Sequence, residues 1–288
     1  MVQHDLASLR RRFAENVAQR ASLTSSALVE ALATVPREAF LGDGPWKIRD
    51  PAAGDGYTET PDADPSPLYA PVLVAIDAER GLNNGEPVSL AGWLDHLGLA
   101  PAAHWLHVGC GLGYYTALGA HVVGPTGRVT ALEVEPSLAE RASANLRPWP
   151  QVEVRLAEDD GIPETSFDAI FVNAGATELL PPWLDGLRPG GRLLVPLTVS
   201  LPSGPIGVGQ MLLVTAGSSP AQAEARFVSP VGIYHCAGAR TVPGERRLRA
   251  AFGAGGAREV KTLDRSTHPP RASCWLHSDG FCLQRDRA

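Results

Sequence analysis

The sequence predicts an α/β protein with a doubly wound sheet that is mostly parallel, has an antiparallel edge, and carries N-terminal helices and a C-terminal extension. From residue 101 onwards, short apolar runs alternate with short helical patterns, which is typical of βαβ units. At residues 105–114 an apolar run is followed by three glycines at alternate positions and then by a helical segment. This pattern indicates a strand, a tight turn and a helix start, as in nucleotide-binding units.

The first hundred residues are predicted to be largely helical. Residues 6–21 have apolar side chains at three- and four-residue spacing, and residues 27–34 carry a second apolar stripe that follows N-cap hydroxyls and stops before Pro36. A short strand is expected at residues 73–76 and a further helix at residues 88–97.

The segment between these elements, residues 42–71, is rich in Pro, Gly and Asp, so regular structure is not expected there. A long loop in a compact domain is often a lid or a substrate-binding segment, but a surface insertion is equally compatible with this composition. Its aromatic residues Trp46, Tyr57 and Tyr69 either cover a bound ligand or anchor the loop to the body.

The later part of the chain supplies the predicted core. Its elements are expected as strand 105–108, helix 115–121, strand 128–132, helix 137–146, strand 152–156, strand 167–173, helix 183–187 and strand 192–196. Because ligands of open α/β sheets lie at the carboxyl ends of the strands, the binding site is expected at that edge.

Beyond this alternation, residues 211–216 and 227–235 have strand character and are close in sequence, which favours an antiparallel hairpin at the sheet edge. A helix at residues 245–252 and an apolar C-terminal patch are expected to pack back on the body. The predicted domains are residues 1–100 (N-terminal helices and a substrate-side cap), 101–240 (the nucleoside-binding core) and 241–288 (the C-terminal extension).

Composition narrows the function. The chain has 288 residues, a formal charge of -6 and 44% hydrophobic residues, so it can bury a large core and lacks the basic balance typical of nucleic-acid binding. No apolar run approaches the ~18–20 residues of a membrane span, and the four cysteines give no disulfide framework. We therefore expect a cytoplasmic protein with reduced cysteines and no nucleic-acid or membrane partner; the oligomeric state is left open.

The glycine turn (residues 109–113) and Glu133 point to a bound nucleoside. Glycine allows the backbone to turn sharply and a ligand to approach closely, and Glu133 ends the next strand, where a ribose-binding carboxylate is expected. The G-x-G-x-G spacing differs from the G-x-G-x-x-G of dinucleotide sites. Dinucleotides, S-adenosylmethionine and a ligand-free tight turn are the alternatives for the turn taken alone.

Several phrases coincide with those of one family. They are Val35-Pro36-Arg37-Glu38-Ala39-Phe40, the glycine turn with Tyr114-Tyr115-Thr116, Glu133 with Leu138-Ala139-Glu140, Asp160-Gly161, Phe167-Asp168-Ala169-Ile170, Leu187 to Pro196, and Gly209-Gln210-Met211-Leu212. On these residues the chain resembles the protein-L-isoaspartate (D-aspartate) O-methyltransferases over residues 20–235. The Val-Pro-Arg-Glu-x-Phe phrase is the most particular of them to this family.

The resemblance implies a Rossmann-like methyltransferase that passes the methyl group of S-adenosyl-L-methionine to a carboxylate and leaves S-adenosyl-L-homocysteine. It assigns the methionine end to the glycine turn, the ribose to Glu133 and the adenine amino group to Asp160. The cofactor-binding candidates that follow are His107, Gly109, Cys110, Gly111, Gly113, Tyr114, Glu133, Asp159, Asp160, Gly161 and Asn173.

Departures from the family pattern concern the acceptor. His107 stands where the family has an acidic residue, and is either a hydrogen-bonding partner near the methionine moiety or a buried core histidine. In Asn84-Gly85-Glu86-Pro87, Gly85 replaces a Ser or Thr hydroxyl that contacts the substrate carboxylate, and losing such a hydrogen bond costs about 1.5–3 kcal/mol. The catalytic candidates are Asn84, Gly85 and Asn173, the last of which either orients the acceptor or caps a strand.

We therefore expect a diverged paralogue whose acceptor is a carboxylate of a peptide, a protein or a small metabolite. Two alternatives remain: an N-, C- or O-methyltransferase of a natural-product scaffold, which needs a general base unless its nucleophile is already activated, and a non-catalytic module that only binds the cofactor.

A metal site is not expected. Cys274, His277 and Cys282, with His235 and Cys236 upstream, offer soft ligands, but their spacing fits no common zinc motif and the apolar residues between them suggest packing.

Overall fold

The computed structural model describes residues 5–50, 56–157, 166–202, 204–219 and 221–285. The chain divides into two compact units: Met1–Ala102 with Cys110–Leu156, and Ala103–Gly109 with Ala157–Ala288. The domain boundaries expected from the sequence stay a prediction. None of the helices in the described ranges has both the length and the apolar composition that crossing a bilayer requires.

The first unit contains the predicted helices. Helix α1 (Leu6–Ala21) packs against α2 (Ser26–Thr34) and α3 (Pro87–Leu97), and α2 and α3 contact α4 (Tyr114–Val123). Helix α2 begins where the Ser25 side chain accepts a hydrogen bond from the Leu28 amide at 3.2 Å, which is the hydroxyl N-cap that the sequence predicts.

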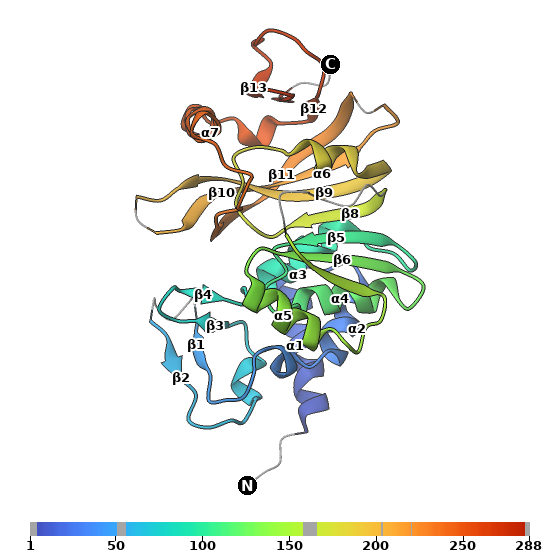
Figure 1. Ribbon diagram of the computed structural model, residues 1–288, viewed down its shortest axis with the longest axis vertical. Coiled ribbons are helices and arrows are strands. Elements are labelled where there is room, and N and C mark those ends of the chain that lie inside the picture. The colour runs from blue at the N-terminus through green and yellow to red at the C-terminus, as the bar shows by residue number, and fades with distance from the viewer. Residues whose placement is uncertain (1–4, 51–55, 158–165, 203, 220, 286–288) are drawn as a thin grey trace. The chain divides into compact units, whose positions relative to one another are not determined.

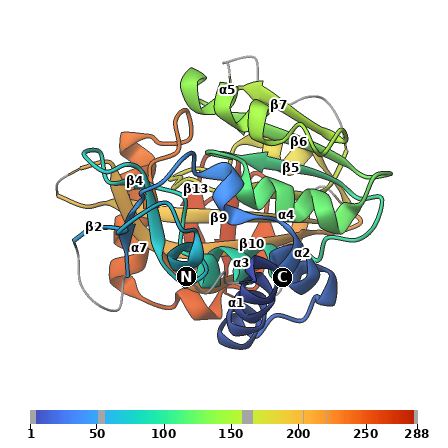
Figure 2. The same ribbon diagram turned by 90° about the horizontal axis from the view of Figure 1, so that it is seen from below.

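Two parallel strands, β6 (Arg128–Glu133) and β7 (Val152–Leu156), lie in the same unit. Helix α5 (Pro136–Asn145) packs against both strands (Figure 2). Strand β6 ends at Glu133, so the strand–helix alternation places this carboxylate at a carboxyl end, as expected.

The expectation of no regular structure in residues 42–71 was wrong. Strands β1 (Lys47–Arg49) and β2 (Thr58–Glu59) join β3 (Leu73–Asp77) and β4 (Leu82–Asn83) in a small sheet of order β2-β1-β3-β4, and 3-10 turns η1 (Arg37–Phe40) and η2 (Ser66–Leu68) lie beside it in sequence. Strand β1 forms by antiparallel pairing with β3, a non-local contact that the local Pro/Gly composition does not reveal.

The aromatic residues of this segment are anchors. Trp46 is buried in a cluster with Leu68, Val74 and Leu112, and Tyr69 is buried as well. The ring of Tyr57 lies under the Arg49 guanidinium, 5.5 Å from the ring centroid. Of the two roles expected for Trp46 and Tyr69, their burial favours the anchor. Because Leu112 belongs to the glycine turn, the cluster also ties the small sheet to that turn.

The second unit is built on a sheet whose neighbouring strands follow the order β13-β14-β12-β11-β10-β9-β8-β5 (Figure 1). Strands β5, β8 and β9 are parallel to one another, and all further pairs are antiparallel. The strands are β5 (His104–Val108), β8 (Phe167–Val172), β9 (Leu187–Ser200), β10 (Ile206–Ala216), β11 (Gln222–Tyr234), β12 (Thr262–Asp264), β13 (Cys274–Ser278) and β14 (Phe281–Gln284). The predicted antiparallel hairpin forms as β10–β11, but its expected place at the sheet edge was wrong, because β12 pairs with β11.

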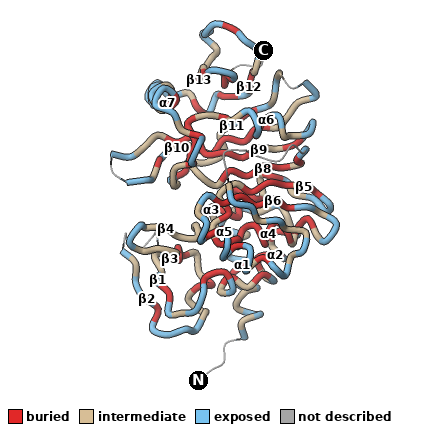
Figure 3. The backbone as a smooth tube through the Cα atoms, in the orientation of Figure 1, coloured by how far each residue is buried: buried red, intermediate tan, exposed pale blue. Residues whose placement is uncertain are grey.

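The helices of this unit are α6 (Pro181–Asp185), α7 (Val242–Ala254) and the 3-10 turn η3 (Ala257–Glu259). Helix α6 ends earlier than expected, and β9 begins at Leu187 rather than at residue 192. Strand β8 is largely buried, and so are residues 193–198 in the middle of β9 (Figure 3). The C-terminal patch, expected only to pack back on the body, extends the sheet as β12, β14 and β13.

Candidate functional site

The glycine turn follows β5 and has a left-handed backbone at each of its glycines, with φ of +77° at Gly109, +57° at Gly111 and +92° at Gly113. A Cβ at Gly113 would lie 2.8 Å from Leu146 Cδ1, so this position is closed by packing. A Cβ at Gly111 would meet nothing within 4 Å among the described residues. Gly111 therefore leaves open space that a side chain would begin to fill.

Glu133 is held at the end of β6 by backbone amides. Its Oε2 accepts a hydrogen bond from Gly111 N at 2.8 Å, and its Oε1 accepts from Val134 N at 2.9 Å and Glu135 N at 3.2 Å. The carboxyl group is buried, and this desolvation raises its pKa although the amides act in the opposite direction. Glu133 is thus a fixed acceptor next to the open face of Gly111.

Helix α4 begins directly after the turn. Its N-cap, Gly113, supplies no side-chain cap, which leaves the helix N-terminus available to an anion. Tyr114 is buried and packs edge-on against Phe40, with ring centroids 5.6 Å apart. Cys110 is also buried, burial raises the pKa of its thiol, and its amide donates to Leu132 O at 3.1 Å. Cys110 is a packed part of the turn.

Gly85 lies in a tight turn before α3. Its φ is +84°, its carbonyl accepts a hydrogen bond from the Tyr115 hydroxyl at 3.2 Å, and its amide donates to Asn83 Oδ1 at 2.9 Å. A Cβ at this position would lie 3.0 Å from Leu90 Cδ2. The glycine is therefore required by the local backbone and packing, and a serine does not fit there without strain.

Asn84 has a defined orientation beside Gly85. Its Oδ1 accepts hydrogen bonds from Arg37 Nη2 at 3.2 Å and, more weakly, from Val74 N at 3.4 Å. Since both neighbours are donors, the oxygen must face them. Its Nδ2 is buried and has no hydrogen-bond partner in the described part of the chain. An unsatisfied buried donor costs about 1–3 kcal/mol, and this cost is removed if a ligand oxygen accepts from it.

Arg37 is a site residue whose role the sequence did not reveal. It is fully buried and donates to the carbonyls of Leu68 (2.7 Å), Ala70 (3.2 Å) and Val72 (2.7 Å) as well as to Asn84. The Val-Pro-Arg-Glu-x-Phe phrase therefore holds the segment that leads to Asn84 and Gly85. The available signal was a charged pair, Arg37 and Glu38, within an apolar phrase.

Asn173 and His107 belong to the second unit. Asn173 follows β8, and its Nδ2 donates to Gly109 O at 3.3 Å while its backbone approaches Gly109 closely enough to favour glycine there. His107 is buried between Trp105 and Phe171, with ring centroids 5.4 and 5.1 Å away, and burial lowers its pKa to about 3. The histidine is neutral and packs in the core; its predicted contact with the methionine moiety stays a prediction.

The remaining candidates, Asp159, Asp160 and Gly161, lie outside the described residues. One further residue was missed. Val134, directly after Glu133, is 51% exposed, which is high for a valine. An exposed apolar side chain beside the Glu133 carboxylate is suited to cover a nucleoside base, and its position after the acidic residue was the available signal.

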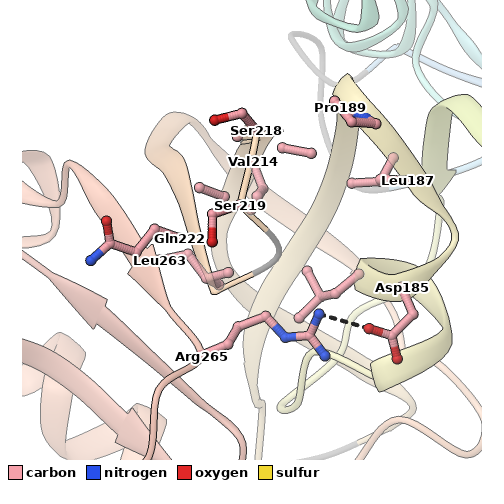
Figure 4. Close-up of a pocket in the computed structure, with 13 residues that line it drawn as sticks. Asp185, Leu187, Pro189, Val214, Ser218, Ser219, Gln222, Leu263 and Arg265 are labelled. Atoms are coloured by element: carbon pink, nitrogen blue, oxygen red, sulfur yellow. Dashed lines mark hydrogen bonds and ion pairs between the residues drawn. The ribbon is translucent and has the colours of Figure 1, made fainter.

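A hollow of about 240 Å³ in the second unit lies elsewhere (Figure 4). It is lined by Leu187, Val214, Gln222 and Arg265 among others, and Arg265 pairs with Asp185 at 2.7 Å. Leu187 is opposite Phe167, the first residue of parallel strand β8. The hollow is thus at the amino ends of these strands, whereas ligands of such sheets bind at the carboxyl ends.

Comparison with known proteins agrees with this geometry. A family model described as protein-L-isoaspartate(D-aspartate) O-methyltransferase matches residues 67–203. Protein-L-isoaspartate O-methyltransferase 2 of Archaeoglobus fulgidus is 32% identical over 198 residues, 65% of this chain and 78% of that protein. The chain belongs to the protein-L-isoaspartate(D-aspartate) O-methyltransferase family. A relative from Methanopyrus kandleri is also 32% identical, over 65% of this chain and 76% of that protein.

Solved structures support the fold of a protein-L-isoaspartate O-methyltransferase. One such structure has a TM-score of 0.66 at 18% identity and covers 96% of this chain and 88% of its own. Another, from Plasmodium falciparum in complex with S-adenosyl-L-homocysteine, has a TM-score of 0.58 at 18% identity and covers 78% and 97%. The predicted Rossmann-like α/β fold is confirmed, and the chain is an S-adenosylmethionine-dependent methyltransferase.

The conformation of Gly85 leads to a testable prediction. Gly85→Ser is expected to lower the free energy of unfolding by about 1–2 kcal/mol, because a left-handed backbone is unfavourable for a residue with a Cβ. Chemical denaturation measures this loss. Gly92→Ala is the matched control, since a Cβ there would meet, among the residues that the structure describes, Ala21 alone, at 3.7 Å. Unchanged stability of Gly85→Ser would contradict the account of this turn.

Proposed function

We propose that this protein transfers a methyl group from S-adenosylmethionine to a carboxylate of a peptide or protein, and that its acceptor site uses Asn84 where relatives use a hydroxyl. The observation that carries the proposal is the amide-held Glu133 carboxylate beside the open face of Gly111. This arrangement suits a nucleoside whose ribose binds to the Glu133 carboxylate and which lies close to the backbone of Gly111.

The residues of the first unit fit the cofactor. Glu133 accepts hydrogen bonds from ribose hydroxyls, Val134 covers the base, and the uncapped N-terminus of α4 attracts the methionine carboxylate. Replacement of Glu133 or Val134 by a bulkier or oppositely charged side chain would remove that fit. Asp160 is assigned to the adenine amino group by resemblance alone.

On the acceptor side, Asn84 Nδ2 supplies the donor that Gly85 lacks. It lies one residue before Gly85, and its orientation is fixed because Arg37 and Val74 N occupy the oxygen. Nδ2 is enclosed in the chain without substrate, so acceptor entry must open the turn around Gly85. A hydrogen bond from Nδ2 then holds the carboxylate and offsets the cost of the buried donor.

The transfer requires little acid–base chemistry. A carboxylate oxygen attacks the methyl carbon, the C–O bond forms as the C–S bond breaks, and the electron pair stays on sulfur as the sulfonium becomes a thioether. No proton moves, so the contribution of the chain is alignment and exclusion of water. This is in keeping with the buried neutral His107, whose lowered pKa does not suit it as a base near neutrality.

An acceptor comparison tests the proposal. The full chain is incubated with methyl-labelled S-adenosylmethionine and either an isoaspartyl peptide, the matching aspartyl peptide, or a small dicarboxylic acid. We expect a methylated peptide, and we expect the isoaspartyl peptide to react slowly, because Asn84 Nδ2, which replaces the hydroxyl missing at Gly85, is enclosed until the turn opens. Efficient methylation of the isoaspartyl peptide would overturn our interpretation of Gly85, and methylation of the small acid alone would overturn the peptide acceptor.

Asn84→Asp tests the donor directly. The substitution keeps an oxygen for Arg37 but replaces the Nδ2 donor by a negative oxygen, so kcat/KM for the acceptor is expected to fall about 10- to 100-fold. Affinity for S-adenosylhomocysteine, measured by calorimetry, is the internal control and should stay unchanged. An unchanged kcat/KM would show that Asn84 has only a structural role.

A further inference from the structure

Four potential metal ligands converge in the C-terminal part of the second unit, outside residues 67–203 that the family model matches. They are His268, Cys274, His277 and Cys282, and their ligand atoms all lie within 4.8 Å of one another. His235 and Cys236, named with this group from the sequence, do not belong to the cluster. His268 replaces them, although it lies six residues before Cys274 in a loop.

The strand register explains how three of the ligands meet. His277 is directly opposite Cys282, and Cys274 is opposite Gln284, on neighbouring antiparallel strands. Residues 282 and 284 share a face, so their partners Cys274 and His277 share it too. Residues three apart in a regular strand point to opposite faces; the irregularity between Cys274 and Leu276 corrects this. The bulge thus places Cys274 and His277 on the same face of the sheet as Cys282.

His268 is prepared as a ligand. Its Nδ1 lies 2.8 Å from Pro269 O, a carbonyl that can only accept, so Nδ1 is the donor and Nε2 is the nitrogen left for a metal ion. The side chain is 2% exposed, and Nε2 is buried without a hydrogen-bond partner among the described residues. Asp264 Oδ2, at 3.6 Å, is beyond hydrogen-bonding distance and already accepts from Gln284 Nε2 at 3.0 Å.

The other three potential ligands lie close to one another and to His268. Cys274 Sγ lies 4.0 Å from His277 Nδ1 and accepts a hydrogen bond from Arg271 N at 3.3 Å. The His268 and His277 rings are 5.0 Å apart, centroid to centroid. Cys282 is buried, and all four cysteines of the chain are free thiols. A small contraction brings these atoms to tetrahedral coordination distances of about 2.0–2.3 Å from a central ion.

We propose that His268, Cys274, His277 and Cys282 form a structural zinc site that fastens the loop after β12 to the β13–β14 hairpin. Two thiolates and two neutral imidazoles give the tetrahedral donor set that Zn²⁺ prefers, and the thiolates neutralise its charge. Four protein ligands leave no open position, so the ion is structural. The strands it joins are only three to five residues long, and elements this short gain from a metal cross-link.

Metal analysis of the full chain tests the site. Untagged protein purified in reducing buffer is expected to hold one zinc per chain after dialysis, and Co²⁺ substitution should give thiolate charge-transfer and tetrahedral ligand-field absorption. Chelation of the ion should lower the melting temperature. Absence of bound zinc or cobalt in the reduced wild-type chain, or a Cys274–Cys282 disulfide in place of the ion, would overturn the proposal without any variant.

Variants assign the ligands. Cys282→Ala and His268→Asn are each expected to weaken zinc affinity about 100-fold or more, since they remove a direct ligand. Cys236→Ala, which removes a buried cysteine outside the cluster, is the matched control and should retain one zinc. Full zinc content in both ligand variants would overturn the assignment. If a variant does not fold, the cobalt spectrum of the wild-type chain decides.

Discussion

Glu133→Ala is expected to weaken S-adenosylhomocysteine binding by about 100-fold. The carboxylate is fixed by three backbone amides, so it is oriented before the ligand arrives. Loss of a charged hydrogen-bonding group from a buried ligand site costs about 1.5–3 kcal/mol per bond, and about 2.8 kcal/mol corresponds to 100-fold in affinity. Isothermal titration calorimetry measures the change.

The control for this prediction is Glu140→Ala, which removes an exposed carboxylate from α5 and should leave affinity unchanged. Because Glu133 also holds the glycine turn, the thermal unfolding of Glu133→Ala is measured in parallel, and Glu133→Asp keeps the charge with a shorter reach. Wild-type affinity in folded Glu133→Ala would contradict the assignment of the ribose site.

Arg37→Met is expected to destabilise the chain by about 3–5 kcal/mol. The guanidinium donates to three backbone carbonyls and to Asn84 Oδ1, and methionine removes all four hydrogen bonds together with the buried donor of the Leu68 and Val72 carbonyls. Chemical denaturation measures the loss directly. In a thermal scan it corresponds to a fall in melting temperature on the order of 10 °C.

Arg12→Met is the matched control, because Arg12 is exposed on α1 and its replacement should change stability by less than about 0.5 kcal/mol. Arg37→Lys separates charge from geometry, since lysine keeps the charge but not the planar fork, and we expect it to recover only part of the lost stability. Equal stability of Arg37→Met and Arg12→Met would contradict the role given to Arg37.

Local patterns predicted much of the fold. Helix α1 has the expected bounds, and strand β7 does as well, because spacing of apolar residues and N-cap hydroxyls are local signals. The small sheet around β1 and the strand β12 were missed because they form by pairing with strands distant in sequence. Strands β13 and β14 form a local hairpin, and the sequence analysis described this segment only as an apolar patch. For residues 42–71, the Pro and Gly content favoured a loop.

Only the parts of the site that depend on local sequence could be predicted. Glu133 follows a strand at a recognisable distance from the glycine turn, so its position could be expected. The reason for a glycine at position 85 could be found only from the backbone conformation, since the positive φ and the contact with Leu90 are not visible in the sequence. The zinc cluster needed both the bulge beside Trp275 and the loop that carries His268, and spacing alone argued against it.

The central claim is methyl transfer to a carboxylate, and the chemical stability of the product tests it most directly. The full chain is incubated with methyl-labelled S-adenosylmethionine and a peptide acceptor, and the labelled product is then exposed to mild base. We expect a methyl ester, so base should release the label as methanol, and Glu133→Ala should form little product. A label that survives base would indicate transfer to nitrogen, carbon or an ether oxygen and would contradict the account.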